Sequence, residues 1–288
     1  MGMQKILVTG SNGQLGNEIK LLSNALPDTE FLFTDFQELD ITDLRAVKQT
    51  VTNFKPNWII NCAAYTAVDK AELEPEKAKM LNAVAPGYLA EASTDSGARM
   101  IHISTDYVFD GRNYKPYKED HTKNAAGIYA KSKSEGEDNV MKYCASAIII
   151  RTSWLYSAYG ANFVKTIRRV GKEKGSLNVV ADQIGSPTWA HDLAFTVLKL
   201  IAMDADAGIY HYSNEGVCSW YDFAQAIIEL SEIKCEVKPT DTAGYPLPSP
   251  RPFYSVLDKS KISNLTGQSI PYWRDSLKKC IALLNEQS

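Results

Sequence analysis

Five short runs of apolar residues recur through the first half of the chain, and a stretch with helical patterning separates each run from the next. The runs are continuous rather than alternating, which is typical of strands buried on both faces of a parallel sheet. They lie at 5–9, 30–34, 58–61, 100–104 and 147–151. The helical stretches between them lie at 13–23, 43–54, 76–93 and 129–143. This alternation predicts an α/β fold with a doubly wound parallel sheet.

The second half of the chain has a different pattern. Short strands there join helical stretches at 162–173, 191–203, 220–231 and 272–284. A loop dense in proline and glycine spans 242–252, and such loops often border a binding site. We therefore expect a nucleotide-binding domain over residues 1–155 and a smaller α/β domain over residues 156–288.

Composition and charge exclude several classes of protein. The chain has 288 residues and a formal net charge of -3, so no basic excess exists to neutralise a nucleic-acid backbone, and we expect no nucleic-acid partner. No apolar run approaches the roughly 18–20 residues that span a bilayer, and no secretory signal precedes the first strand. We therefore expect no membrane partner and a cytoplasmic location. The five cysteines have no C-x-x-C spacing, which favours free thiols.

A glycine-rich turn, Gly10-Ser11-Asn12-Gly13-Gln14-Leu15-Gly16, directly follows the first predicted strand. Glycines there let the backbone approach a pyrophosphate, and the next helix offers unpaired N–H groups at the positive end of its dipole. A glycine turn in this place can also be purely structural. The strand before it, the helix after it and an acidic residue at the end of the next strand favour a dinucleotide site. The expected contacts are Gly10, Asn12, Gly13, Gln14, Leu15 and Gly16.

That acidic residue is Asp35, nineteen residues after Gly16. Its carboxylate is placed to accept hydrogen bonds from the adenosine ribose and to repel a 2′-phosphate, so we expect NADH or NADPH as the cofactor, with NADH favoured. Asp40 and Ile41 are the next expected contacts, beside the adenine, although Asp40 is equally compatible with a helix N-terminal or turn carboxylate. Small residues after the third strand leave room for the cofactor, and the expected contacts there are Ala63, Ala64 and Tyr65.

Tyr129 and Lys133 are four residues apart in a predicted helix, so both project from one face. A nearby ammonium group favours the phenolate and lowers the pKa of the tyrosine, which suits a residue that exchanges a proton with a reacting oxygen. Thr105, at the end of the fourth strand, would hold a substrate carbonyl by a hydrogen bond. The Y-x-x-x-K pattern alone is common by chance. Together with the glycine turn and the threonine, in this order, it indicates a reductase.

These motifs resemble those of the extended short-chain dehydrogenase/reductases. Further phrases are similar to the dTDP-4-dehydrorhamnose reductase family within that group: NCAAYTAVDKAE at 61–72, STDYVF at 104–109, RTSWLY at 151–156, DQIGSPT at 182–188 and Arg251-Pro252. The similarity runs from Lys5 to about Leu284. It implies a Rossmann domain and a smaller substrate domain between which the chain passes more than once, with 187–213 as a segment that returns to the first.

The resemblance also implies the chemistry. A hydride passes from NAD(P)H to C4 of a nucleotide sugar, dTDP-4-dehydro-L-rhamnose, giving dTDP-L-rhamnose. Tyr129 protonates the oxygen, and Lys133 contacts the nicotinamide ribose. Asp106 is implied as a sugar contact, Trp154 as a wall of the sugar site and Arg251 as a clamp on the diphosphate. Trp154 is also compatible with a core aromatic, and Arg251 with a surface arginine in a loop.

Two other functions stay open. A 4-epimerase needs the same three catalytic residues and a retained cofactor, and a non-catalytic NAD(P)-binding regulatory subunit needs only the fold. A dehydratase is disfavoured, because related dehydratases carry an Asp-Glu pair after the threonine, whereas this chain has Asp106-Tyr107.

A homodimer is compatible with the resemblance, because some family members are described as dimerising through a metal held by glutamates. Glu18 matches one such position, but His191-Asp192 stands where the pattern requires a glutamate. We therefore expect no metal site, and Glu18 is predicted to be a solvated carboxylate of the first helix. The four histidines show no ligand spacing and are expected to be structural.

Overall fold

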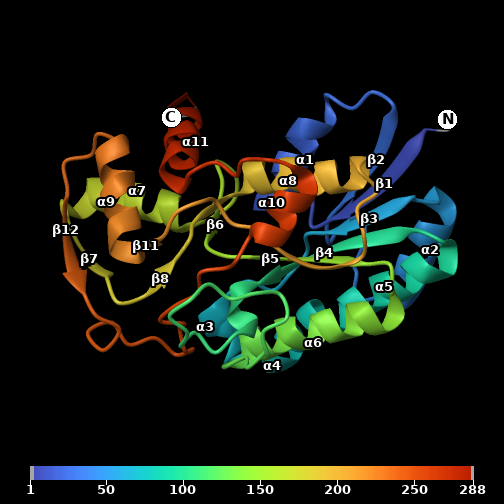
Figure 1. Ribbon diagram of the computed structural model, residues 1–288, viewed down its shortest axis with the longest axis horizontal. Coiled ribbons are helices and arrows are strands. Elements are labelled where there is room, and N and C mark those ends of the chain that lie inside the picture. The colour runs from blue at the N-terminus through green and yellow to red at the C-terminus, as the bar shows by residue number, and fades with distance from the viewer. Residues whose placement is uncertain (1–2, 287–288) are drawn as a thin grey trace.

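The computed structural model describes residues 3–286 and is built around a parallel six-stranded sheet (Figure 1). The strands are β1 (Gln4–Thr9), β2 (Thr29–Thr34), β3 (Trp58–Asn61), β4 (Arg99–Thr105), β5 (Ile148–Thr152) and β10 (Gly208–His211). Their order is β10-β5-β4-β3-β1-β2. This confirms the predicted α/β class with a doubly wound parallel sheet, and the five strands predicted in the first half each match within one residue at either end.

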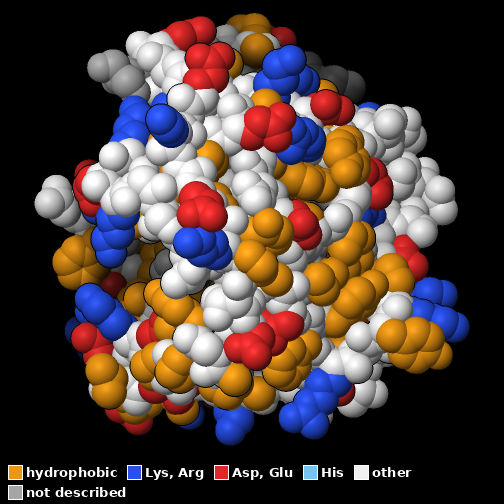
Figure 2. Space-filling view, turned by 90° about the vertical axis from the view of Figure 1, so that its left-hand side faces the viewer, with side chains coloured by type: hydrophobic (Ala, Val, Ile, Leu, Met, Phe, Trp, Pro, Cys, Tyr) orange, Lys and Arg blue, Asp and Glu red, His pale blue; other side chains and the backbone are white. Residues whose placement is uncertain are grey.

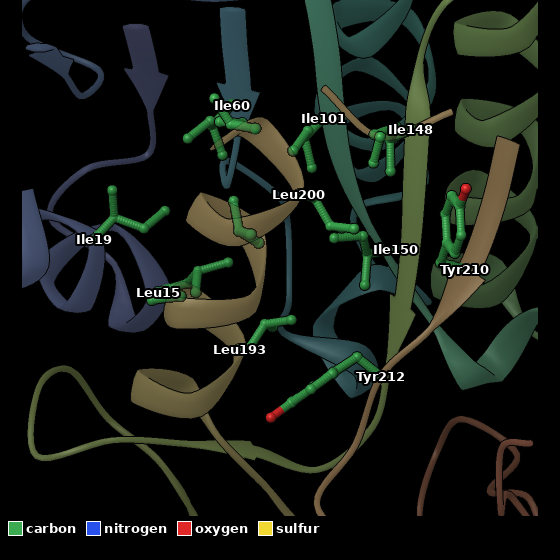
Figure 3. Packing of buried hydrophobic residues seen from close by; sticks show 14 of the residues in the cluster. Leu15, Ile19, Ile60, Ile101, Ile148, Ile150, Leu193, Leu200, Tyr210 and Tyr212 are labelled. Atoms are coloured by element: carbon green, nitrogen blue, oxygen red, sulfur yellow. The ribbon is translucent and has the colours of Figure 1, made fainter. Parts of the chain in front are cut away.

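Helices cover both faces of this sheet. On one face lie α1 (Gln14–Ser23), α8 (Ala190–Ala202) and α10 (Ser260–Thr266); on the other lie α2 (Leu44–Phe54), α5 (Ala85–Ser96) and α6 (Ile128–Tyr143) (Figure 1). Figure 3 shows the first layer from close by, with Leu193 and Leu200 of α8 directed towards Ile150 of the sheet. Leu15 and Ile19 of α1 belong to the same buried cluster. Burial on both faces explains why the strands read as continuous apolar runs.

The helical stretch predicted over 76–93 is confirmed, but the helix contains a π-helical segment that the sequence analysis did not predict. The chain forms α3 (Val68–Ala71), α4 (Pro75–Lys79), a single π-helical segment η1 (Met80–Val84) and then α5. Within η1, the Ala85 N–H bonds the Met80 carbonyl five residues earlier. Pro86 follows the break and has no N–H to donate to the Asn82 carbonyl, so the regular α pattern cannot run through this point.

A second layer of helices packs beside the sheet around its own buried cluster. It consists of α7 (Phe163–Lys174), α9 (Trp220–Leu230) and α11 (Trp273–Glu286), with small strand pairs at its edges. The pairs are β7 (Ser176–Val180) with β12 (Glu236–Thr240), β6 (Leu155–Tyr156) with β9 (Thr188–Trp189), and β8 (Ile184–Gly185) with β11 (Cys218–Ser219). Figure 2 shows this end of the molecule, where hydrophobic side chains lie among acidic and basic ones.

The strand order places a crevice between β1 and β3. From β1 the chain crosses to β2 on one side, and from β2 it returns to β3 on the other side. Ligands of open α/β sheets bind at such a reversal, beyond the carboxyl ends of the strands. The register sets Thr9 of β1 opposite Thr34 and Asn61, so the segments that begin at Gly10, Asp35 and Cys62 emerge side by side. Within residues 3–286, no helix is long and apolar enough to cross a membrane.

Candidate active site

A cavity of about 790 Å³ opens at this crevice. Its volume lies within the roughly 300–1,000 Å³ that is typical of small-molecule sites. The predicted cofactor contacts in its wall are Gly10, Asn12, Gly13, Asp35, Asp40, Ile41, Ala63 and Ala64.

Two glycine positions of the turn, Gly10 and Gly16, are packed so tightly that a side chain would not fit there. Gly10 has φ +67°, and a Cβ there would lie 2.6 Å from the Ala63 nitrogen. A Cβ on Gly16 would lie 2.5 Å from the Gly10 carbonyl oxygen. Gly13 precedes α1 and provides no side-chain cap, which leaves N–H groups at the helix start for a bound anion. These features fit the pyrophosphate of a dinucleotide.

Two acidic residues of the cavity wall have different surroundings. The Asp35 carboxylate accepts hydrogen bonds from the backbone N–H of Asn12 at 2.9 Å and of Phe36 at 2.8 Å, so it lies directly against the glycine turn. Asp40 Oδ1 accepts from both the N–H and the hydroxyl of Thr42, at 2.9 and 2.7 Å. Asp40 therefore closes a local turn as well as lining the cavity, as the sequence had allowed.

Six other predicted cofactor contacts lie outside the cavity wall; two of them, Tyr129 and Lys133, lie on α6, and the other four surround the glycine turn and α3. Leu15 is packed in the core beneath the sheet, and Gly16 faces the turn. The Gln14 amide donates to the Leu155 carbonyl at 3.5 Å and accepts from Asn162 at 3.0 Å, so it connects α1 to the second layer. Tyr65 donates its N–H to Asn82 at 2.8 Å and its hydroxyl to Glu74 at 2.8 Å.

The wall also contains residues that the sequence did not single out. They are Phe36, Leu39, Thr42, Cys62, Lys77, Met80 and Leu81. The last two belong to the π-helical segment η1, as does Asn82, which is fully buried. Asn82 accepts from the Tyr65 N–H and donates to the Ser132 hydroxyl of α6 at 3.1 Å, and it thereby ties the end of the cavity to the helix with Tyr129. Pro86, which cannot continue a regular α-helix, was the feature of the sequence that could have pointed to this segment.

Tyr129 and Lys133 lie on α6, whose first N–H, that of Ile128, donates to Glu72 Oε1 at 2.9 Å. The Tyr129 ring is buried and makes an edge-to-face contact with Tyr107 at 5.4 Å. Burial raises the pKa of Tyr129 to about 12, although a hydrogen bond with Thr105 acts in the opposite direction. The phenol is therefore protonated at neutral pH.

This result corrects the expectation that Lys133 lowers the pKa of Tyr129. Lys133 Nζ donates to the Ile103 carbonyl at 2.7 Å, so the ammonium group is held by β4. Burial lowers the pKa of Lys133 to about 8, while the charge of Glu137 acts in the opposite direction. The i, i+4 spacing placed both residues on one face but did not reveal the loss of water around the phenol.

Thr105 and Asp106 lie where β4 passes into a single 3₁₀ turn, η2 (Asp106–Val108). The Thr105 hydroxyl donates to Asp106 Oδ1 at 3.0 Å and accepts from the Tyr107 N–H at 3.3 Å. Asp106 is only 2% exposed. Burial raises the pKa of Asp106 to about 6, against smaller opposing effects of Ser255 and Thr105.

We expect Asp106→Asn to stabilise the fold in a pH-dependent way. The folded-state pKa is about 6 against an ordinary value of 3.8, so the folded state binds more protons and stability falls as pH rises through that window. An amide has no charge to bury, so the variant gains about 3 kcal/mol at pH 8 and less than about 1 kcal/mol near pH 4. Urea unfolding at both pH values measures the gain. Equal stability differences at the two pH values would contradict this explanation.

Trp154 packs against the second layer, and Arg251 lies in the proline-rich loop. Trp154 has φ +48° and stacks on Trp220 with ring centroids 3.7 Å apart, a strained backbone of the kind found at functional sites. Arg251 is 14% exposed and donates to Asp69 Oδ2 at 2.7 Å and to the Ser249 carbonyl at 3.0 Å. The loop is thereby anchored to α3, and Asp69 is a residue that sequence reasoning missed.

Glu18 is not the solvated carboxylate that the sequence predicted. It is 1% exposed, accepts a hydrogen bond from the Ser157 hydroxyl at 2.6 Å and lies 3.1 Å from His191 Nδ1. Both partners are far away in the sequence, which explains the wrong prediction. Among the described residues, no group of three or more His, Cys, Asp or Glu side chains is arranged to hold a metal ion.

The thiols and the remaining histidines have structural surroundings. All five cysteines are free, as predicted, and Cys144, Cys218 and Cys280 are buried. His102 and His211 are fully buried in the sheet. His102 lies 3.0 Å from the Asn61 amide, and His211 lies 3.1 Å from the Tyr117 carbonyl.

Comparisons with known proteins agree over nearly the whole chain. The family model described as the RmlD substrate binding domain matches residues 3–286. The dTDP-4-dehydrorhamnose reductase of Aggregatibacter actinomycetemcomitans is 42% identical over 287 residues, covering 96% of this chain and 98% of that protein. A crystal structure of dTDP-4-dehydrorhamnose reductase from Clostridium acetobutylicum has a TM-score of 0.94 at 44% identity, covering 98% of this chain and 100% of that one. The Bacillus anthracis dTDP-4-dehydrorhamnose reductase, in complex with NADP, has a TM-score of 0.94 at 40% identity with the same coverage.

Proposed function

This chain belongs to the RmlD substrate binding domain family, and from that premise we propose that it is an NAD(P)H-dependent dTDP-4-dehydrorhamnose reductase. Its reaction would convert the C4 keto group of dTDP-4-dehydro-L-rhamnose to the hydroxyl of dTDP-L-rhamnose. The observation that carries the proposal is the convergence of Tyr129, Thr105 and Lys133 at the carboxyl end of β4, in a sheet whose crevice fits a dinucleotide.

The residues of the cavity wall fit the cofactor. We propose that the N–H groups of the glycine turn hold the pyrophosphate and that Asp35 holds the adenosine ribose. When bound, the reduced nicotinamide supplies the hydride for the carbonyl carbon. The division of the chain near residue 155, with the sugar held mainly by residues 156–288, is part of the same proposal.

Tyr129 is proposed as the proton donor. Because its pKa is raised to about 12, the phenol keeps its proton at neutral pH and can give it only to a strong base, such as the alkoxide that forms from the substrate. Thr105 would turn its hydroxyl from Asp106 to the substrate oxygen and stabilise the developing charge. Lys133 would present its ammonium group to the nicotinamide ribose from its position at the Ile103 carbonyl.

Three further side chains are proposed to hold the nucleotide sugar. Asp106 lies next to Thr105 and would accept a hydrogen bond from a sugar hydroxyl. Trp154 would present its ring to the sugar, with its backbone fixed in a left-handed conformation. Arg251 is fixed by Asp69 and the Ser249 carbonyl, so its remaining N–H groups are oriented for a diphosphate.

Asp35 is proposed to favour NADH. We expect Asp35→Ala to lower the ratio of kcat/KM for NADH to that for NADPH by about tenfold, because the variant loses hydrogen bonds to the ribose and no longer repels a 2′-phosphate. The ratio is measured with one enzyme preparation and both cofactors, so the fraction of active protein cancels. An unaltered ratio would mean that other residues recognise the ribose.

The proposed function is tested by the loss of NADH and NADPH absorbance with enzymatically prepared dTDP-4-dehydro-L-rhamnose. One equivalent of cofactor consumed for each sugar nucleotide is the expected result. Interconversion of sugars without net consumption of cofactor would indicate the 4-epimerase instead. Cofactor binding without any conversion would indicate a regulatory subunit.

A further inference from the structure

A buried ion pair lies behind the candidate catalytic residues. Glu137 of α6 and Arg151 of β5 are each 1% exposed. Arg151 Nε donates to Glu137 Oε1 and Arg151 Nη2 donates to Glu137 Oε2, both at 2.8 Å. Two parallel hydrogen bonds of this kind fix the carboxylate plane as well as its place.

The same carboxylate reaches the end of β4. The Ser104 hydroxyl donates to Glu137 Oε1 at 2.6 Å, and Ser104 directly precedes Thr105. Ser104 and Arg151 are also register partners in neighbouring strands. Glu137 therefore fastens α6 to the ends of two strands, one of which carries Thr105.

Glu137 is also a neighbour of Lys133. The two residues are four apart on α6, so they project from one face of the helix. Glu137 is the charge that opposes the effect of burial on the pKa of Lys133. The other titratable group that faces Lys133 is His102 of β4; burial and the charge of Lys133 hold its pKa well below the usual value, so its imidazole is neutral. Lys123 lies on a more exposed side of the pair: its Nζ is 3.6 Å from Glu137 Oε2, and its side chain is 24% exposed.

The remaining neighbours keep the pair charged. Arg151 Nη1 donates to the Glu119 carbonyl at 3.2 Å and lies 3.4 Å from His211 Nε2. Burial and the charge of Arg151 lower the pKa of His211 to about 3, so this imidazole is neutral. Burial alone would raise the pKa of Glu137, but Arg151, with Ser104 and Lys123, holds it below its ordinary range. The carboxylate is therefore negative throughout the pH range in which the enzyme would work.

Stability alone does not account for such a pair. Replacing a buried ion pair by apolar side chains of similar volume is often neutral or stabilising, because two charges no longer have to be desolvated. A role in the reaction accounts better for its place, since it contacts the strand end before Thr105 and shares a helix face with Lys133.

We propose that Glu137 is a positioning residue for the reaction: clamped by Arg151 and Ser104, it holds α6 against the end of β4 and supplies the negative charge that keeps Lys133 an ammonium ion. The inference rests on the proposed function, because it gives Lys133 a part in the reduction. Lys133 is charged only below its pKa, so loss of the Glu137 charge moves its deprotonation to lower pH.

The test uses the double variant Glu137→Gln/Arg151→Met, which leaves neither charge unpaired. An NMR titration follows the side-chain carbon of Lys133, assigned with Lys133→Arg, in the free protein without substrate. We expect a midpoint near pH 8 in the unaltered protein, where burial lowers the pKa of Lys133 to about 8, and a lower midpoint in the double variant. The same midpoint in both proteins would overturn the proposal.

Kinetics supply the second measurement. In the double variant we expect kcat to fall about tenfold, the high-pH limb of the kcat profile to move to lower pH, and KM for the cofactor to stay within about twofold. Leu277→Ala, a core truncation in α11, is the control: it lowers the melting temperature and leaves both the midpoint and the limb in place. If the high-pH limb of the kcat profile also shifts in Leu277→Ala, the effect of the double variant reflects lost stability, and Glu137 has only a structural role.

Two precautions keep the outcomes distinct. If the double variant does not fold, Ser104→Ala retains both charges and loosens only the clamp. We expect kcat to fall severalfold and the melting temperature to fall by only a few degrees. An unchanged kcat there would contradict the clamp. If the unaltered protein reduces no nucleotide sugar while the titration midpoint still moves, the proposed function fails and the effect of Glu137 on Lys133 stands.

Discussion

Tyr129→Phe is expected to lower kcat by a factor of about 10² or more, because the variant has no hydroxyl to protonate the substrate oxygen. The ring and its edge-to-face contact with Tyr107 remain, so the fold and the cofactor cavity are retained. We therefore expect the Kd for NADH to stay within about twofold. Steady-state kinetics and the quenching of protein fluorescence by NADH measure the two quantities.

Tyr143→Phe is the matched control for this variant. Tyr143 ends the same helix and is 40% exposed, so loss of its hydroxyl is expected to leave kcat unchanged. Full turnover by Tyr129→Phe would remove this residue from the mechanism. An equal fall in both variants would indicate a general effect on α6 instead of a lost proton donor.

The second large effect is expected from Gly16→Ala. A Cβ at this position would lie 2.5 Å from the Gly10 carbonyl oxygen and 2.5 Å from the Ser11 Cα, both of which are backbone atoms. The turn would have to shift, which we expect to cost about 2 kcal/mol of stability. A shifted turn no longer presents its N–H groups to the pyrophosphate, and we expect the Kd for NADH to rise at least about tenfold.

Gly267→Ala separates strain from the loss of the cofactor site. Gly267 follows α10 with φ +63°, and a Cβ there would meet nothing within 4 Å. This control is expected to lose about 1 kcal/mol of stability through backbone strain and to bind NADH normally. Normal NADH binding by Gly16→Ala would show that the turn does not hold the cofactor.

Most of the sheet was predictable because its strands are buried on both faces. Continuous apolar runs such as that of β3 (Trp58–Asn61) have few other interpretations, and the helices between them begin and end close to the predicted residues. The π-helical geometry of η1 was not predicted, although Pro86 was visible in the sequence, because the helical pattern continues on both sides of the proline.

The candidate site was predictable only in its local features. The glycine turn at 10–16 and the pair Tyr129 and Lys133 are each recognised from residues close together in the sequence. The burial of Glu18 depends on Ser157 and His191, which are 139 and 173 residues away, and no pattern around Glu18 indicates them. The raised pKa of Tyr129 likewise depends on how the surrounding chain excludes water, and not on its spacing from Lys133.

Isotope transfer tests directly whether this chain reduces the C4 carbonyl of a nucleotide sugar. The enzyme is incubated with dTDP-4-dehydro-L-rhamnose and NADH that carries deuterium at the transferred position, and the product is examined by NMR. We expect dTDP-L-rhamnose with one deuterium at C4 for each NADH consumed. A product without deuterium at C4, or a sugar isomerised while NADH stays intact, would contradict it.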